Sequence, residues 1–295
     1  MQGDGGPCIP IQTQILVRPA AFVTLVVMRK SLFCFFFAMA LPVIAAEIRI
    51  NFADYPVGKL PDGFQSVLAG GGKSGDWQVV DDTIPSAFTP LTRQASGMTS
   101  HPSLAQLSDD PTDERFPMLV YNRETFEDFK LSTTFKIVAG GVEQMAGIVF
   151  HLQNETNFYV IRVSALGHNL RFYKVVNGVR SDPIGVGLDV SGGAWHKLAV
   201  QCQGNHYSFS LDDHLILFDG HPNIDDNTFG SGKVGYWTKS DSITHFGDTT
   251  ISYTPRVPMA QALVDSIMQK YPRIVGLQVY ALDGKNVPRV IGSKY

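Results

Sequence analysis

Hydrophobic and polar residues alternate in short runs, bounded by Gly, Asp, Asn and Pro, over residues 48–253. In residues 129–137 (FKLSTTFKI) every second position is hydrophobic or a small Thr, which predicts a strand with one face in a core and the other in water. Residues 146–152 (AGIVFHL) are apolar at nearly every position, which predicts a central strand covered on both faces. About a dozen such segments need two packed sheets, so the pattern predicts an all-β sandwich.

Turn signals separate the predicted strands. Asn177-Gly178 is the strongest two-residue hairpin signal in the chain, and Asp212-Asp213 marks another turn. The turns therefore specify which strands are neighbours. The strands predicted around them are 157–163, 170–176, 195–202, 206–211, 214–218, 233–239 and 243–253.

The hydrophobic period changes after residue 254. Apolar residues at helical spacing predict a helix over 258–271, and residues 275–282 and 288–291 predict a hairpin about Asp283-Gly284. A helix and two strands are too small to fold alone. Residues 254–295 are therefore expected to form a small α+β appendage to the sandwich, or the front of a truncated second domain.

The N-terminal segment has the pattern of a secretory signal. Met28 is followed by Arg and Lys, then by the apolar residues 31–44, then by Ala45-Ala46. We predict that Met28 is the true start and that residues 1–46 are leader and signal peptide. The apolar run is shorter than the roughly 20 residues that cross a bilayer, so no membrane span is expected after cleavage. The predicted location is secreted or periplasmic.

Charge and cysteine content narrow the picture. The chain has 24 Lys and Arg against 27 Asp and Glu, a net charge of −3, and no long basic run, which argues against nucleic acid as a partner. Of the three cysteines, Cys8 and Cys34 belong to the predicted leader. Cys202 is then alone, so we expect no internal disulfide and a small buried residue.

Alternation places one set of polar residues together. The residues predicted to face the core are Ile148, Phe150, Tyr159, Ile161, Val163, Val234 and Tyr236. His151, Arg162, Trp237 and Lys239 then fall on the opposite face. An indole beside cationic and imidazole groups is typical of a saccharide site. The alternative is that Trp237 and Trp195 are core aromatics and that Arg162 closes an internal ion pair; we assign Trp195 to the core.

Other site chemistries lack support in the sequence. The eight His residues are scattered without metal-binding spacing, and the acidic residues near 225–227 fit ordinary turns. Residues 70–74 (GGGKS) do not complete a phosphate-binding loop. No metal and no cofactor are predicted.

Three ordered motifs resemble a known family. They are residues 146–176 followed by NGVR, residues 193–198 (GAWHKL) and residues 232–242 (GKVGYWTKSDS). They are similar to those of a bacterial exported family with a concanavalin-like (laminin-G-like) jelly roll, related in fold to the 3-keto-disaccharide hydrolase domain, a domain of unknown function in many proteins. The resemblance covers about residues 48–253 and implies a concanavalin-like jelly-roll β-sandwich that is relevant to glycans. The chain departs from it at His151, Gly167-His168 and Gly247.

The end of the chain has a separate resemblance. Residues 268–294 look like the opening of a small extracellular sensor module of the Cache type, which has a helix followed by strands.

Two functions follow as hypotheses. The first is an exported lectin-like domain that binds a glycan or small saccharide through His151, Arg162, Trp237 and Lys239. The alternative is a glycoside hydrolase of the 3-keto-disaccharide hydrolase type. In that case Glu143 or Asp241 would be the general acid or base, with His151 nearby. The sequence predicts neither a protein partner nor an oligomeric state.

Overall fold

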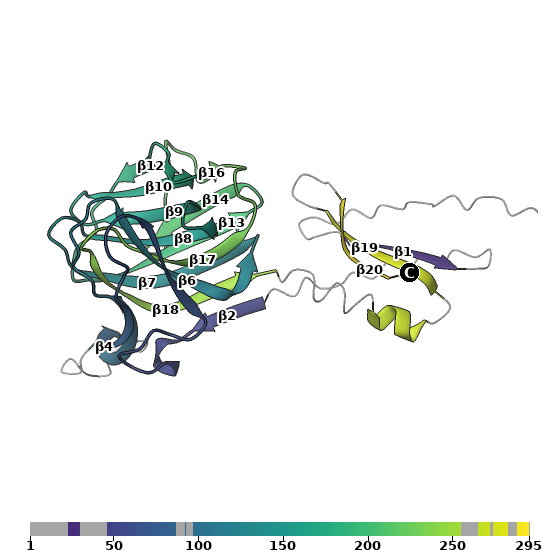
Figure 1. The fold of residues 1–295 in the computed structure, drawn as a ribbon, viewed down its shortest axis with the longest axis horizontal. Helices are drawn as coiled ribbons and strands as arrows, with labels where there is room; N and C mark the ends of the chain where they lie inside the picture. The colour runs from purple at the N-terminus through teal and green to yellow at the C-terminus, as the bar shows by residue number, and fades with distance from the viewer. Residues whose placement is uncertain are drawn as a thin grey trace, which may run out of the picture. The chain divides into compact units, whose positions relative to one another are not determined.

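The computed structural model describes residues 23–29, 46–86, 92, 97–254, 265–271, 274–282 and 288–294. The chain divides into two compact units: one is Ala46–Tyr253, and the other comprises Met1–Ala45 and Thr254–Tyr295. The first unit is the β-sandwich drawn in Figure 1. No helix in the described ranges is long and apolar enough to cross a membrane.

One sheet of the sandwich, called here the β8 sheet, has eight antiparallel strands. In Figure 1 its strands β10, β9, β8 and β17 follow one another down the view. Its order is β11 (Val179–Arg180), β10 (Asn169–Val176), β9 (Asn157–Ser164), β8 (Met145–Asn154), β17 (Gly232–Trp237), β6 (Arg115–Phe126) and β3 (Phe64–Gly70), with β12 (Ile184–Gly187) beside β10.

The other sheet, called the β7 sheet, has nine strands. Its order is β15 (His214–Leu215), β14 (His206–Leu211), β13 (Trp195–Gln203), β7 (Phe129–Ala139), β18 (Ile243–Tyr253), β5 (Met98–Gln106) and β4 (Trp77–Pro85), with β16 (Ile224–Asp225) beside β14 and β2 (Ala46–Ile50) beside β18. A short 3-10 helix, η1 (Phe52–Asp54), follows β2. The predicted two-sheet sandwich is confirmed.

The main hydrophobic core lies between the two sheets. In β7 the residues from Phe129 to Ile137 alternate between buried and more exposed positions, as the hydrophobic pattern predicts. β8 pairs with β9 and β17, and its first eight residues are buried, so the predicted central strand is confirmed. All seven residues predicted to face the core belong to this cluster. Cys202 is a buried free thiol, as expected.

A second hydrophobic cluster lies on the outer face of the β8 sheet. Its buried members include Met118, Val120, Val149, Val160 and Trp237. They alternate along their strands with residues of the main core, so both faces of this sheet are largely shielded from water. The apolar character of residues 146–152 follows from this double coverage.

Two predicted strands are shorter in the structure. β15 stops at Leu215, and β17 stops at Trp237 rather than at residue 239. Ser240 takes a positive φ of 52°, and its backbone N–H donates to the carbonyl of Arg115 at 2.8 Å. Lys239 therefore lies in a turn after β17 and not in the strand.

The second unit contains a three-stranded sheet in the order β1 (Val23–Arg29), β19 (Ile274–Leu282), β20 (Pro288–Lys294). The antiparallel pairing of β19 with β20 confirms the predicted hairpin. Residues 265–270 are helical, and the first part of the predicted helix 258–271 lies outside the described residues. β1 pairs with β19 and contains Met28, the predicted start. The predicted leader, signal cleavage and domain limits stay predictions.

Candidate functional site

Gly147 brings two of the predicted ligand residues together. It is the cross-strand partner of Arg162 on β9 and of Trp237 on β17. A Cβ atom at position 147 would lie 3.0 Å from the Cβ of Arg162 and 3.1 Å from Cε3 of Trp237. Both side chains therefore lie on the outer face of the β8 sheet, on either side of a glycine that leaves room for them. The position of Arg162 and Trp237 on the outer face agrees with the predicted alternation. Their role in binding a ligand stays a prediction.

Trp237 is part of an aromatic pair. Its ring stacks on that of Phe116 with centroids 5.7 Å apart and planes 18° from parallel. Phe116 is half-buried, whereas Trp237 is only 4% exposed. Phe116 thus forms the accessible side of the pair, with Trp237 beneath it.

Arg162 has polar partners but no ion pair. Its guanidinium donates to Oδ1 of Asn169 and, at 3.2 Å, to the hydroxyl of Tyr173. Within the described part of the chain, no carboxylate lies within 4.0 Å of it, so the internal ion pair of the alternative interpretation is absent there. The side chain is buried, since the residue is 4% exposed, and this burial lowers the pKa of Arg162. A buried cation is thus held by neutral groups.

Tyr173 is surrounded by arginines. Burial raises the pKa of its hydroxyl, but Arg171 and Arg162 outweigh burial and bring the pKa below its usual value. The guanidinium carbon of Arg180 lies 5.1 Å from the Tyr173 ring centre and 5.6 Å from that of Phe116. We call the surface formed by Arg162, Arg171, Arg180, Tyr173 and the Phe116–Trp237 pair the arginine face.

Arg180 shows that this face is curled. Arg180 lies on edge strand β11, and Phe116 lies on β6, five strand spacings away, which is about 24 Å across a flat sheet. Arg180 nevertheless reaches the Phe116 ring, and its Nη2 lies 3.4 Å from Oε1 of Glu114. The β8 sheet therefore curls toward its outer side, and Arg180 and Glu114 form a bridge across the arginine face.

Lys239 forms ion pairs with two acidic residues at the end of the β8 sheet. Its Nζ lies 2.7 Å from Oδ1 of Asp113 and 2.9 Å from Oε1 of Glu143. Burial lowers the pKa of Lys239, but the two carboxylates outweigh burial and raise it. The charge of Glu143 also acts on Arg162. Lys239 thus lies near the arginine face, with its own charge already balanced.

Asp241 has a structural role in the turn before β8. Its carboxylate accepts backbone N–H groups of Gly141, Val142 and Glu143 at 2.6, 2.9 and 2.9 Å. Burial raises its pKa, yet these N–H groups outweigh burial and hold the pKa below the ordinary value. Its carboxylate oxygens are therefore used in holding residues 141–143.

His151 does not join the other predicted residues, which corrects its predicted placement. The register of β8 with β9 shifts between Phe150 and Asn154, and His151 takes a positive φ of 46°. This bulge turns the imidazole toward the core side, where it is fully buried and contacts the rings of Phe150 and Tyr159. Simple alternation fails because the bulge adds residues to the strand.

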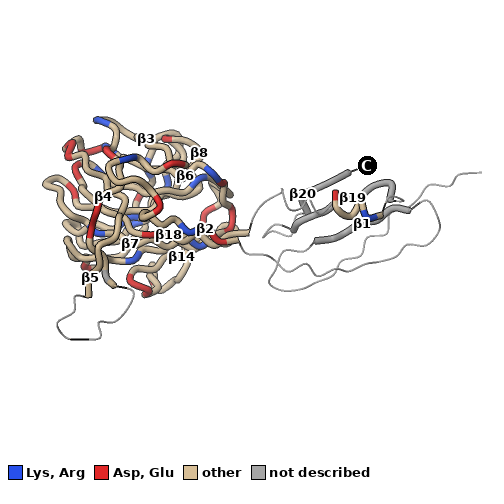
Figure 2. Tube along the Cα trace, turned by 90° about the horizontal axis from the view of Figure 1, so that it is seen from below, with Lys and Arg blue, Asp and Glu red and all other residues tan. Residues whose placement is uncertain are grey.

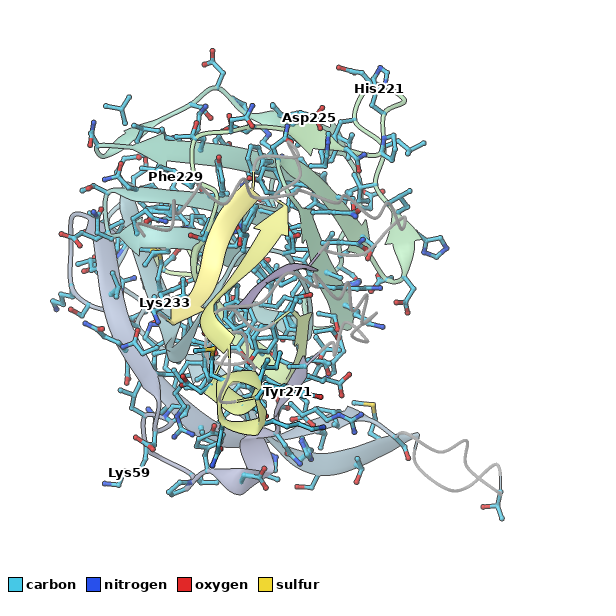
Figure 3. All side chains as sticks on the ribbon, turned by 90° about the vertical axis from the view of Figure 1, so that its right-hand side faces the viewer. Lys59, His221, Asp225, Phe229, Lys233 and Tyr271 are labelled. Atoms are coloured by element: carbon cyan, nitrogen blue, oxygen red, sulfur yellow. The ribbon has the colours of Figure 1, made fainter. Side chains whose placement is uncertain are left out.

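The imidazole of His151 ties two loops together. Nδ1 lies 2.9 Å from the carbonyl oxygen of Phe229, and Nε2 lies 3.0 Å from that of Glu127. Phe229 is labelled in Figure 3, on the same side of the sandwich as Lys233 at the start of β17. Burial lowers the pKa of His151. His151 is at the far end of β8 from Glu143 and Asp241, so the three predicted catalytic residues do not form one site.

Trp195 lies outside the core, which corrects its assignment. It is half-buried and faces outward from the β7 sheet, where its Nε1 donates to the carbonyl of Thr83 at 2.7 Å. Nζ of Lys136 lies 5.0 Å from its ring centre. The signal was present in the sequence, because Leu198, Val200 and Cys202 occupy the inward positions of the same strand. A surface cavity of about 310 Å³ is lined there by Ile84, Thr134, Trp195, His196, Lys197, Asp212 and Asp213.

His196 is held in place beside this cavity. Its Nδ1 lies 2.8 Å from Oδ2 of Asp212, and its Nε2 lies 3.3 Å from Oγ and 3.2 Å from the carbonyl oxygen of Ser191.

Across the described ranges no group of three His, Cys, Asp or Glu residues has a geometry that would hold a metal ion. Acidic and basic residues are interspersed along the sandwich (Figure 2).

Comparison with known proteins agrees with the fold. Residues 75–218, just under half of the chain, match the family model described as the Beta xylosidase C-terminal Concanavalin A-like domain. The chain thus has a concanavalin-like jelly-roll sandwich. No curated protein matches it.

Several solved structures are similar to the chain. The carbohydrate binding module CBM66 from Bacillus subtilis is 18% identical with a TM-score of 0.47, over 64% of this chain and 95% of that one. A Bacillus licheniformis beta-glucanase is 13% identical with a TM-score of 0.40, over 72% and 100%. The Caenorhabditis elegans galectin LEC-6 is 8% identical with a TM-score of 0.35, over 43% and 84%. Similarity this distant extends no ligand or reaction to this chain.

Proposed function

We propose that the sandwich is a carbohydrate-binding domain and that it binds a saccharide on the arginine face. The observation that carries the proposal is the row across Gly147, where Arg162 lies on one side of the glycine and Trp237, stacked on Phe116, lies on the other. Aromatic rings offer a flat apolar surface to sugar CH groups, and guanidinium and phenol groups orient sugar hydroxyls. The match to the concanavalin A-like domain of beta xylosidases supports the same class of ligand.

The ligand gains access by moving Arg180. Its side chain covers Phe116 and Tyr173, and its ion pair with Glu114 is well exposed, with side-chain exposures of 38% and 58%. Such a pair contributes about 0–1 kcal/mol. The bridge is therefore easily displaced, and Phe116 is the first ring that a bound sugar would meet.

The test is calorimetry of the full chain against a panel of neutral and charged oligosaccharides. Phe116→Ala is expected to weaken binding of any ligand found by about tenfold or more, because its ring is the accessible side of the stack. Trp195→Phe, on the β7 sheet, is the control and should bind as the original chain does. Equal binding by both variants would place the ligand elsewhere, and no binding to any saccharide would end the proposal.

The geometry gives less support to the hydrolase alternative of the 3-keto-disaccharide hydrolase type. A general acid or base must be within hydrogen-bond reach of the reacting group. The nitrogens of His151 face backbone carbonyls, Asp241 holds a turn, and Glu143 pairs with Lys239. These partners favour binding over catalysis by that set of residues.

We also infer that the chain is exported, as a secreted or periplasmic protein. The support is the cationic, apolar and small-residue pattern from Met28 to Ala46. Intact mass measurement of the protein recovered from a secreting host tests this: a mature N-terminus near Glu47 is expected, and an intact N-terminus in the cytosol contradicts it.

A further inference from the structure

Three arginines from neighbouring strands surround one tyrosine on the arginine face. Arg162 donates to the Tyr173 hydroxyl, Arg171 lies two residues before Tyr173 on the same face of β10, and Arg180 lies against the Tyr173 ring. Arg162 and Arg171 are also direct cross-strand partners in the β9–β10 register. Like charges directly opposite each other in a sheet repel, so the packing of this cluster has a cost.

The carboxylates near this cluster either bind Lys239 or lie exposed at its edge. Neither Arg162 nor Arg171 has a carboxylate within 4.0 Å among the residues that the structure describes, and Arg180 has only the exposed Glu114. Glu143, whose charge acts on Arg162, is half-buried and bound by Lys239. A buried cation without a counter-ion is costly, and arginine is the side chain best suited to bind a planar anion through paired N–H groups.

We propose that the saccharide bound on the arginine face is anionic and that Arg162 and Arg171 bind its acidic group. This inference rests on the proposed function and specifies its ligand class. A carboxylate or a sulfate ester on the sugar supplies the charge that Arg162 and Arg171 lack. Tyr173 and Asn169 hold the buried Arg162 guanidinium in orientation, while the half-buried Arg171 remains open to the ligand.

The experiment compares matched ligands on the full chain. Calorimetry uses a uronic acid oligosaccharide, its methyl ester, which has the same ring system without the charge, and a sulfated oligosaccharide with its unsulfated parent. We expect one acidic ligand to bind at least tenfold more tightly than its neutral counterpart, and to lose affinity when the salt concentration rises from 50 to 200 mM. A difference in affinity within the uronic acid pair indicates a carboxylate site, and a difference within the sulfated pair indicates a sulfate site.

Arg171→Gln is the principal variant, because Arg171 is less buried than Arg162 and its replacement is expected to leave the fold intact. It should remove the preference, so that the acidic ligand and its neutral counterpart bind with equal affinity. Lys197→Gln, on the other sheet, removes one positive charge as a control and should keep the preference.

The outcomes separate the two proposals. Equal affinity for the acidic and neutral members of both pairs, lowered by Phe116→Ala but not by Arg171→Gln, overturns the anionic ligand and leaves saccharide binding standing. A preference that Lys197→Gln abolishes as well would be an effect of overall charge and also overturns it. No binding to any member of either pair counts against the proposed function itself.

Discussion

The outer faces of the two sheets differ in how their charges are balanced. On the β7 sheet each described Lys or His near the cavity lies beside a carboxylate. These pairs are Lys136 and His245 with Asp82, His196 with Asp212, and Lys197 with Asp213. On the arginine face of the β8 sheet, Arg162 and Arg171 pair with neutral groups or lie beside each other.

The difference indicates which face is built for stability and which for a ligand. A charge that finds its partner within the fold contributes to the fold and has little left to offer a ligand. A buried charge held only by neutral groups has been oriented without being neutralised, which is how binding sites are preorganised. A cavity lies beside Trp195 on the β7 sheet, yet it is the arginine face that has the unpaired buried charge.

The largest expected effect is a loss of stability when the ion pairs on the outer face of the β7 sheet are broken. Asp82→Ala leaves Lys136 and His245 without their shared carboxylate, and all three side chains are at most 15% exposed. Removing one partner of a buried ion pair costs about 3 kcal/mol, measurable as a lower urea midpoint. Asp213→Ala, whose side chain is 76% exposed, is the control and should change stability little. Equal losses in the two variants would contradict the buried role of Asp82.

The next largest effect is expected on the arginine face, where a substitution should lower ligand affinity more than stability. Arg162→Met replaces a buried cation that has no described ion pair with an apolar side chain of similar length, so the urea midpoint should change by less than for Asp82→Ala. Affinity for an acidic saccharide should fall about 100-fold, or about 2.7 kcal/mol. A variant that remains folded with a much lower urea midpoint, yet binds the acidic saccharide as tightly as the original chain, would make Arg162 structural.

The contribution of Asp82 on the β7 sheet to stability should depend on pH in the acid range. Burial raises the pKa of Asp82, but hydrogen bonds from Lys136, His245 and the Thr83 backbone outweigh burial and lower the pKa below its ordinary value of 3.8. Asp82 therefore stabilises the fold fully above about pH 4 and loses this contribution as the pH falls through the lower folded-state pKa. Thermal melts between pH 5 and pH 2 should show a shallower acid decline for Asp82→Asn than for the original chain. Parallel declines would refute this linkage.

The smallest effect is expected for the bridge over the arginine face. Arg180→Ala removes an exposed ion pair and the cover over Phe116, so stability should fall by less than about 1 kcal/mol. In a background of Trp77→Phe and Trp195→Phe, acrylamide should quench Trp237 fluorescence more strongly once Arg180 is removed. Unchanged quenching would show that the bridge does not control access.

Local pattern predicted most of the β-sandwich because burial was the main constraint on each strand. The alternation in residues 129–137 identified β7, and the apolar run 146–152 identified β8 as central. The same rule placed Arg162 and Trp237 on the outer face. The same alternation also predicts that Trp195 faces outward, because Val200 on the same strand faces inward. Trp195 was nevertheless assigned to the core because tryptophan is usually buried.

The sequence by itself determined the two-sheet architecture, the central position of β8 and the outward face of Arg162 and Trp237, because the two-residue period of a strand links side-chain polarity directly to its face. Only the tertiary structure decided that a bulge takes His151 into the core side, that Lys239 and Glu143 balance each other, and that curling of the β8 sheet brings Arg180 over Phe116. These features depend on strand register, on loops distant in sequence and on sheet curvature. None of them has a local signal, because each is set by contacts between segments that the order of residues alone does not bring together.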